Sequence, residues 1–182
     1  MNLKKTNIYD DFLHNLSGTS FQVSPPFKIS RILFIFFSYE FLAVLFFRLY
    51  SSLYRYRVTK IFSIILYSIY KYIFKVDIHP KAKIGNGLLL VHGFNIVIGP
   101  EAIIGNFVCI FDGVSIGKKN VGTNDGMPVI GDNVIIGSGA KLLGEIRIAS
   151  QTIIGANSVV IKSILKEGCT VAGIPAKVLR NG

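Results

Sequence analysis

An aliphatic residue recurs at every sixth position through most of the second half of the chain. The series runs through three segments, and every member is Ile, Leu or Val: positions 78, 84 and 90; positions 98, 104, 110 and 116; and positions 130, 136, 142, 148, 154 and 160. A helix repeats about every 3.6 residues and a strand about every second residue, so neither explains a period of six. Hexapeptide repeats are typical of parallel β-helices. The series therefore predicts an all-β parallel β-helix of about five triangular coils.

Glycine accompanies the repeat. In seven cases the periodic residue is an Ile followed directly by Gly, at positions 85, 99, 105, 117, 131, 137 and 155. We expect these glycines to form the corners between short strands, because Gly adopts backbone angles that other residues resist. The aliphatic side chains of successive coils would then stack at about 4.8 Å, the spacing of neighbouring strands.

The period slips first between Leu90 and Ile98, where eight residues replace six and push out His92, Gly93, Phe94 and Asn95. In an unbroken repeat Asp77 would lie under residue 95, so the two extra residues bring the corner of His92 back over that of Asp77. A carboxylate beside an imidazole fixes its tautomer and stabilises its protonated form, as a general base requires. The spacing also leaves open a surface histidine and an aspartate that merely caps the coil. We expect His79, just before Pro80, to make a structural hydrogen bond.

The second slip lies between Ile116 and Ile130, where fourteen residues replace six. It predicts a loop drawn from Lys118 to Pro128. Insertions in a repeat usually map to one face of the solenoid, often the binding face. Both slips are therefore candidate functional regions.

The first 76 residues differ in composition and predict an α-helical N-terminal segment, residues 1–76, before the β-helix domain, residues 77–182. An apolar run of sixteen residues, Ile32 to Phe47, is shorter than the roughly twenty that span a membrane. A second segment, Ile61 to Ile73, also keeps helical spacing. Three interpretations stay open: packing on each other, the β-helix or a sister subunit; peripheral contact with a membrane surface; and a membrane span.

Charge is concentrated in the same segment, where ten Lys and Arg face three acids, out of a net charge of +10 for the chain. This excess can face anionic lipid, the phosphates of a ligand, or water. We expect no nucleic-acid partner, because no binding module or basic–aromatic strand pattern accompanies the charge.

Cysteine and histidine usage limits the cofactor chemistry. Cys109 and Cys169 lack paired metal spacing, so we expect buried or reduced thiols in a cytoplasmic protein. A location at the inner face of the membrane stays open. Only His14, His79 and His92 occur, the first outside the repeat, so no metal site is predicted. The N-terminus lacks the apolar core of a secretory signal.

Several motifs, among them DIHPKAKIGNG, PVIGDNVIIGSGAKLLG and AGIPAKVLR, resemble the serine acetyltransferases of the left-handed hexapeptide-repeat acyltransferase superfamily, from Val76 to Arg180. The resemblance implies a left-handed β-helix, a homotrimer or dimer of trimers with active sites between adjacent prisms, and O-acetyl transfer from acetyl-CoA. Asp77 and His92 match the family's catalytic acid and histidine. The resemblance also implies contacts to acetyl-CoA. The pantetheine arm would lie against Gly117, Lys118, Ser138 and Ala156, and the phosphates would meet Lys177 and Arg180.

Three departures bear on the acceptor. Where the family has an Asp before its catalytic histidine this chain has Val91, and an Arg–His pair that grips the carboxylate of serine is replaced by Gly126 and Met127. A zwitterion in such a site would leave its charges unpaired, at a cost of several kcal/mol. We therefore expect a sugar hydroxyl in surface polysaccharide biosynthesis as acceptor. Serine, as in cysteine biosynthesis, is the alternative, and a non-catalytic β-helix platform is a remote one.

Overall fold

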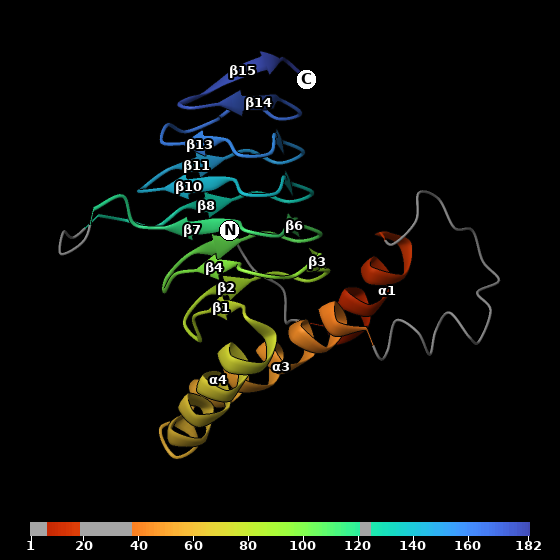
Figure 1. The fold of residues 1–182 in the computed structure, drawn as a ribbon, viewed down its shortest axis with the longest axis vertical. Helices are drawn as coiled ribbons and strands as arrows, with labels where there is room; N and C mark the ends of the chain where they lie inside the picture. The colour runs from red at the N-terminus through yellow and green to blue at the C-terminus, as the bar shows by residue number, and fades with distance from the viewer. Residues whose placement is uncertain (1–6, 19–37, 121–124) are drawn as a thin grey trace.

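The computed structural model describes residues 7–18, 38–120 and 125–182. Three helices come first, α1 (Ile8–Gly18), α3 (Tyr39–Tyr54) and α4 (Lys60–Phe74), and short strands fill the rest of the chain. The strands stack into a triangular solenoid that rises from the helices to the C-terminus (Figure 1). The chain is thus a left-handed parallel β-helix preceded by helices, as predicted.

The solenoid has three faces, which we name A, B and C in the order in which the chain first meets them. Face A holds β1 (Asp77–Ile78), β4 (Val97–Ile98), β7 (Ser115–Gly117), β10 (Lys141–Leu143) and β13 (Val159–Val160). Face B holds β2 (Lys83–Ile84), β5 (Ile103–Ile104), β8 (Val129–Ile130) and β11 (Arg147–Ile148). Face C holds β3 (Leu89–Val91), β6 (Cys109–Phe111), β9 (Ile135–Ile136), β12 (Ile153–Ile154), β14 (Thr170–Gly173) and β15 (Ala176–Arg180). Neighbouring strands are parallel, except that β14 and β15 form an antiparallel pair at the end.

The periodic aliphatic residues form the core of the solenoid. All thirteen are at most 3% exposed. The strand register stacks them on one another, as Ile78 on Ile98 and Ile104 on Ile130 show. The predicted core is confirmed, because one inward position per face is all that a coil of this width can fill.

The seven glycines that follow an Ile lie where strands end, as predicted, but the predicted reason, unusual backbone angles, is wrong. None of them has a positive φ; that conformation falls instead on corner residues such as Asn133 and Asn157. These glycines are instead required mainly by the close approach of successive coils. A Cβ on Gly105 would lie 2.5 Å from the carbonyl oxygen of Gly131, and one on Gly137 would lie 2.7 Å from the nitrogen of Ala156.

Both slips in the period change the strand register as predicted. Asp77 pairs with Val97, twenty residues later, because the corner between β3 and β4 holds two extra residues. Cys109 pairs with Ile135, twenty-six residues later, because eight extra residues lie between β7 and β8, and the described ends of this connection extend away from the solenoid (Figure 1). In that loop the side-chain amide of Asn120 donates to a carboxylate oxygen of Asp125, at 2.9 Å.

The helices pack directly on the first coils. Buried residues of α3, including Val44, Phe47 and Tyr50, belong to the same hydrophobic core as the solenoid residues. A buried ion pair at 2.8 Å joins Arg48 of α3 to Asp11 of α1. Because Arg48 also donates to the carbonyl oxygen of Ile84, and Asp11 accepts from the backbone N–H of Leu88, both helices are bonded to the coil edge.

The change of structure falls near the predicted boundary at Val76, because α4 ends at Phe74 and β1 begins at Asp77. Within the described residues, no helix is long and apolar enough to cross a membrane. Helix α3 begins after Ser38, whose hydroxyl accepts from the backbone N–H of Phe41 and caps the helix. The part of the predicted apolar run before residue 38 lies outside the described residues.

Candidate active site

The chain passes from face C to face A at a corner that repeats in every coil, and we name this stack the C–A column. Backbone hydrogen bonds tie its layers together. The N–H of Asn95 donates to Lys75, that of Gly113 to Phe94, that of Gly139 to Asp112 and that of Asn157 to Ser138, all at 2.8–2.9 Å. The corner of His92 therefore lies directly above the residues that lead into Asp77.

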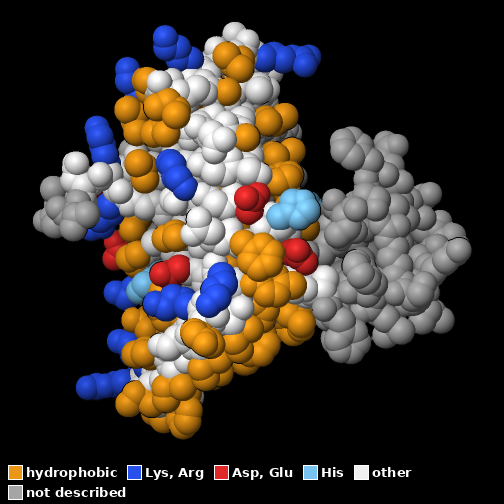
Figure 2. Space-filling model, in the orientation of Figure 1, with side chains coloured by type: hydrophobic (Ala, Val, Ile, Leu, Met, Phe, Trp, Pro, Cys, Tyr) orange, Lys and Arg blue, Asp and Glu red, His pale blue; other side chains and the backbone are white. Residues whose placement is uncertain are grey.

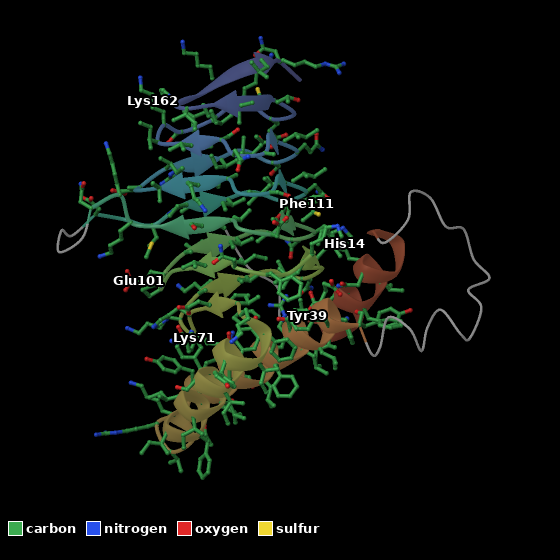
Figure 3. All side chains as sticks on the ribbon, viewed as in Figure 1. His14, Tyr39, Lys71, Glu101, Phe111 and Lys162 are labelled. Carbon is green, nitrogen blue, oxygen red and sulfur yellow. The ribbon has the colours of Figure 1, made fainter. Side chains whose placement is uncertain are left out.

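His92 occupies the extra turn of this corner. Its φ is 50°, and its side chain is exposed. Its carbonyl oxygen accepts from the N–H of Phe94 at 2.6 Å, and the next residue, Gly93, is buried. The Phe94 ring stacks on Tyr39 with 4.8 Å between centroids, at the start of α3 (Figure 3). The helix thereby fixes the turn that carries the imidazole.

Asp77 is half-buried at the start of face A. The hydroxyl of Tyr67 on α4 donates a hydrogen bond to its Oδ1. Burial and the neighbouring carboxylate raise the pKa of Tyr67, so this hydroxyl stays protonated and remains a donor. Within the described residues, no hydrogen bond or ion pair joins Asp77 to His92. The corners stack as predicted, and the catalytic roles of the two residues stay predictions.

Glu40 lies near this corner although the sequence did not mark it as a site residue. This half-buried acid in the first turn of α3 has its Cγ 3.7 Å from the position that a Cβ on Gly93 would take. A carboxylate-bearing side chain therefore lies next to the corner of His92. A single acid within a long apolar run was the only signal in the sequence that could have drawn attention to it.

The residues predicted to contact acetyl-CoA fall into three groups. Ser138 and Ala156 lie in the C–A column, two and three layers above His92. Gly117 and Lys118 lie at the opposite edge of face A, where a Cβ on Gly117 would meet no atom within 4 Å. Lys177 and Arg180 are exposed on β15 at the C-terminal end of the solenoid. Within this chain these groups do not converge, and their contacts to acetyl-CoA stay predictions.

Two of the three positions that depart from the family pattern are apolar in structure as well, whereas Gly126 lies against the side chain of Glu145, whose Cγ would be 2.8 Å from a Cβ on that glycine. Val91 ends β3 and is half-buried. Met127 is buried, and its Cε lies only 2.5 Å from the position that a Cβ on Gly99 would take. Met127 thus packs against the solenoid, because its apolar side chain fills the space that the glycine leaves open.

The other candidate residues have structural environments. The backbone N–H of Lys81 donates to Nδ1 of His79 at 3.1 Å, which confirms the expected structural bond, and burial and Lys81 lower the pKa of that imidazole. Both cysteines are free thiols, as predicted, and burial raises the pKa of Cys109 to about 11. His14 bonds to the carbonyl oxygen of Gly87 at 2.5 Å (Figure 3). The described part of the chain holds no cluster of three His, Cys, Asp or Glu side chains suited to a metal.

The sequence of the chain is similar to those of known acyl-transferring proteins. Residues 127–162 match the family described as bacterial transferase hexapeptide (six repeats). Among curated proteins, a serine acetyltransferase of Staphylococcus aureus is 44% identical over 105 residues, which cover 58% of this chain and 49% of that protein.

Solved structures of other proteins superpose on nearly the whole chain. Soybean serine acetyltransferase complexed with serine superposes with a TM-score of 0.80 at 33% identity, covering 94% of this chain and 69% of that one. The chain belongs to the serine acetyltransferase family. A second family member, from Brucella abortus in complex with coenzyme A, gives a TM-score of 0.82 at 33% identity, covering 96% and 66%. This serine acetyltransferase homologue spans 39–49% of the length of the curated relatives it matches.

Proposed function

We propose that the chain is an O-acetyltransferase that moves the acetyl group of acetyl-CoA to a hydroxyl oxygen. The observation that carries the proposal is the exposed imidazole of His92 in the C–A column, directly above the corner that leads into Asp77. Membership of the serine acetyltransferase family supports the same reaction.

In this reaction Nε2 or Nδ1 of His92 takes the proton of the acceptor hydroxyl while its oxygen attacks the thioester carbonyl carbon. The new C–O bond gives a tetrahedral intermediate. Its oxyanion is stabilised by backbone N–H groups. Collapse then breaks the C–S bond, and the protonated imidazole returns its proton to the departing thiolate of coenzyme A. Atoms and charge balance without a metal or a redox partner.

Asp77 orients His92 and stabilises its protonated form. Tyr67 bonds to one carboxylate oxygen, Oδ1, which leaves Oδ2 for the imidazole. The direct contact forms when acceptor and acetyl-CoA fill the site, since catalytic hydrogen bonds often tighten only in the substrate complex. The hydrogen bond by which Tyr67 of α4 holds the carboxylate of Asp77 is consistent with this role.

Acetyl-CoA is the proposed donor, in line with the coenzyme A complex of the Brucella relative. Small residues at Ser138 and Ala156 leave room for the pantetheine arm along the column, and Gly117 leaves room at the other edge of face A. Lys177 and Arg180 would meet the phosphates. Because these groups lie apart in one subunit, we propose that adjacent subunits of a homotrimer complete each site.

Serine is the first acceptor that we propose. The relatives described above are serine acetyltransferases, so the sugar hydroxyl and the polysaccharide pathway expected from the sequence gain no support from them. The carboxylate of Glu40, close to the corner of His92, offers a partner for the ammonium group of serine in place of the acid missing at Val91.

A sugar hydroxyl remains the second candidate because of one observation. Met127 packs against the solenoid and Val91 is apolar, so neither supplies the charged groups that a free amino acid requires. A neutral acceptor would leave no charge unpaired there.

The test is release of coenzyme A thiol from acetyl-CoA, followed with a chromogenic disulfide, in the presence of serine or of a panel of sugars and nucleotide sugars. We expect turnover with serine at millimolar concentration, and a loss of about a hundredfold to ten-thousandfold in kcat for His92→Ala. Turnover with a sugar alone would support the second candidate. If no acceptor accelerates thiol release and His92→Ala changes nothing, the chain is a non-catalytic platform.

A further inference from the structure

The outer surface of α4 is apolar and exposed. Seven large apolar side chains along this helix are each at least 46% exposed, namely Ile61, Phe62, Ile64, Ile65, Ile69, Tyr72 and Ile73. Val58, in the turn between α3 and α4, is 88% exposed. Figure 2 shows hydrophobic side chains gathered over the helical end of the molecule. An apolar surface of this extent usually marks a protein or membrane contact.

These side chains share one face of the helix. Ser63, Tyr70 and Phe74 are buried on the inner face, so the outer face lies opposite them. At about 100° per residue, Ile61, Ile65, Ile69 and Tyr72 fall along the centre of that outer face. Lys60, Lys71 and Lys75 fall together along one of its borders, and all three are exposed.

The chain segment that forms this face carries positive charge only. From Phe41 to Val76 the chain contains no Asp or Glu and six Lys or Arg. Arg48 is buried in its ion pair with Asp11, and the other five, Arg55, Arg57, Lys60, Lys71 and Lys75, are exposed.

The border lysines extend over aromatic rings. The ammonium groups of Lys60, Lys71 and Lys75 lie 4.5–5.0 Å from the ring centroids of Tyr54, Tyr67 and Tyr72. These cation–π contacts hold the ammonium groups along the border of the face. Because all three lysines are exposed, the same ammonium groups can also meet headgroups.

We propose that α4 docks this protein on an anionic lipid surface. The apolar outer face would enter the boundary between headgroups and acyl chains, and the five exposed cations would meet lipid phosphates. A second copy of the chain fits this face less well. If two such faces packed together, the cations of one copy would lie near those of the other, and the segment carries no acidic residue to neutralise them. Since α4 already packs on α3 through its inner face, docking needs no rearrangement of the fold.

The test is co-sedimentation of the purified full chain with vesicles of phosphatidylcholine alone or mixed equally with phosphatidylglycerol. We expect binding to the anionic vesicles that weakens as salt rises. Lys60→Gln with Lys71→Gln should reduce the partition coefficient roughly 25-fold. Ile65→Ser with Ile69→Ser should abolish sedimentation, and because both side chains are exposed these variants should keep the thermal unfolding temperature.

The matched control changes Lys162 and Lys166, exposed at the other end of the solenoid, to Gln, and should bind vesicles normally. Binding that ignores lipid charge, or that survives both pairs of α4 substitutions, would overturn the proposal. So would absence of vesicle binding together with a dimer that Ile65→Ser and Ile69→Ser dissociate, because the face would then belong to a second copy. Thiol release with a soluble acceptor should be unchanged in all these variants, which separates this proposal from the proposed reaction.

Discussion

Tyr67 on α4 donates its hydroxyl hydrogen bond to Asp77, the first residue of the β-helix. The last helix before the solenoid therefore fixes the carboxylate that we propose as the partner of His92. The same helix carries the apolar outer face, so one element links the candidate active site to the proposed lipid contact.

Removal of the Tyr67 hydroxyl should lower catalysis without unfolding the protein. Tyr67→Phe keeps the ring and frees Asp77 to turn away from the His92 corner. We expect kcat for acetyl transfer to fall roughly tenfold, since misplaced catalytic groups are costly, while KM for acetyl-CoA stays the same. Tyr72→Phe, an exposed tyrosine of the same helix, is the control. Equal rates for the two variants would exclude a positioning role for Tyr67.

Glu40 should matter only if the acceptor carries an ammonium group. With serine, Glu40→Gln should raise KM for serine by about tenfold, because a charge-assisted hydrogen bond contributes more than a neutral one. KM for acetyl-CoA should not change. Glu101→Gln, at an exposed acid of a solenoid corner, is the control. A KM for serine that is the same in both variants would argue against Glu40 as the ammonium partner.

Two glycine substitutions separate coil stacking from ligand contact. A Cβ on Gly105 would lie 2.3 Å from Oδ1 of Asp132 and 2.5 Å from the Gly131 carbonyl oxygen, so Gly105→Ala should lower the free energy of unfolding by about 2 kcal/mol. Gly117→Ala meets no atom within 4 Å and should leave stability within about 0.5 kcal/mol.

Urea unfolding measures both variants, and steady-state kinetics then tests the ligand role. If Gly117 lies against acetyl-CoA, as its open surroundings permit, Gly117→Ala should raise KM for acetyl-CoA despite its unchanged stability. An unaltered KM would remove Gly117 from the proposed groove.

Two buried tyrosines of the helical region should respond in opposite directions to loss of their hydroxyls. Tyr70 is fully buried, and its hydroxyl is the one buried side-chain polar atom in the described part of the chain without a hydrogen-bond partner. Tyr70→Phe should therefore raise the free energy of unfolding by about 1 kcal/mol.

Tyr50 provides the matched comparison, because its equally buried hydroxyl donates to the carbonyl oxygen of Ile78 at 2.6 Å. Tyr50→Phe should lower stability by about 1 kcal/mol or more, since an unsatisfied carbonyl remains. Urea unfolding of both variants checks the prediction. A Tyr70→Phe protein less stable than the parent would mean that its hydroxyl makes a contact after all.

Features of the fold that depend on contacts between neighbouring repeats were predictable from the sequence, and features that depend on more distant contacts were not. The coil, its inward residues and the slipped corner of His92 were predictable, because a repeat of six residues is a local pattern that each unit satisfies against its neighbours. The conformation of the glycines was not, because the clash that requires them comes from the next coil and not from their own dihedral angles.

The sequence by itself determined the solenoid and the stacking of the corner of His92 over the corner that leads into Asp77, because short units with a shared aliphatic position can stack in only one register that keeps every aliphatic residue inside. Only the tertiary structure decided which groups surround these residues. The approach of Tyr67 to Asp77, of Glu40 to Gly93 and of Arg48 to Asp11 depends on how three helices pack against the first coils. That packing is governed by side-chain shapes distant in sequence, for which no periodic signal exists.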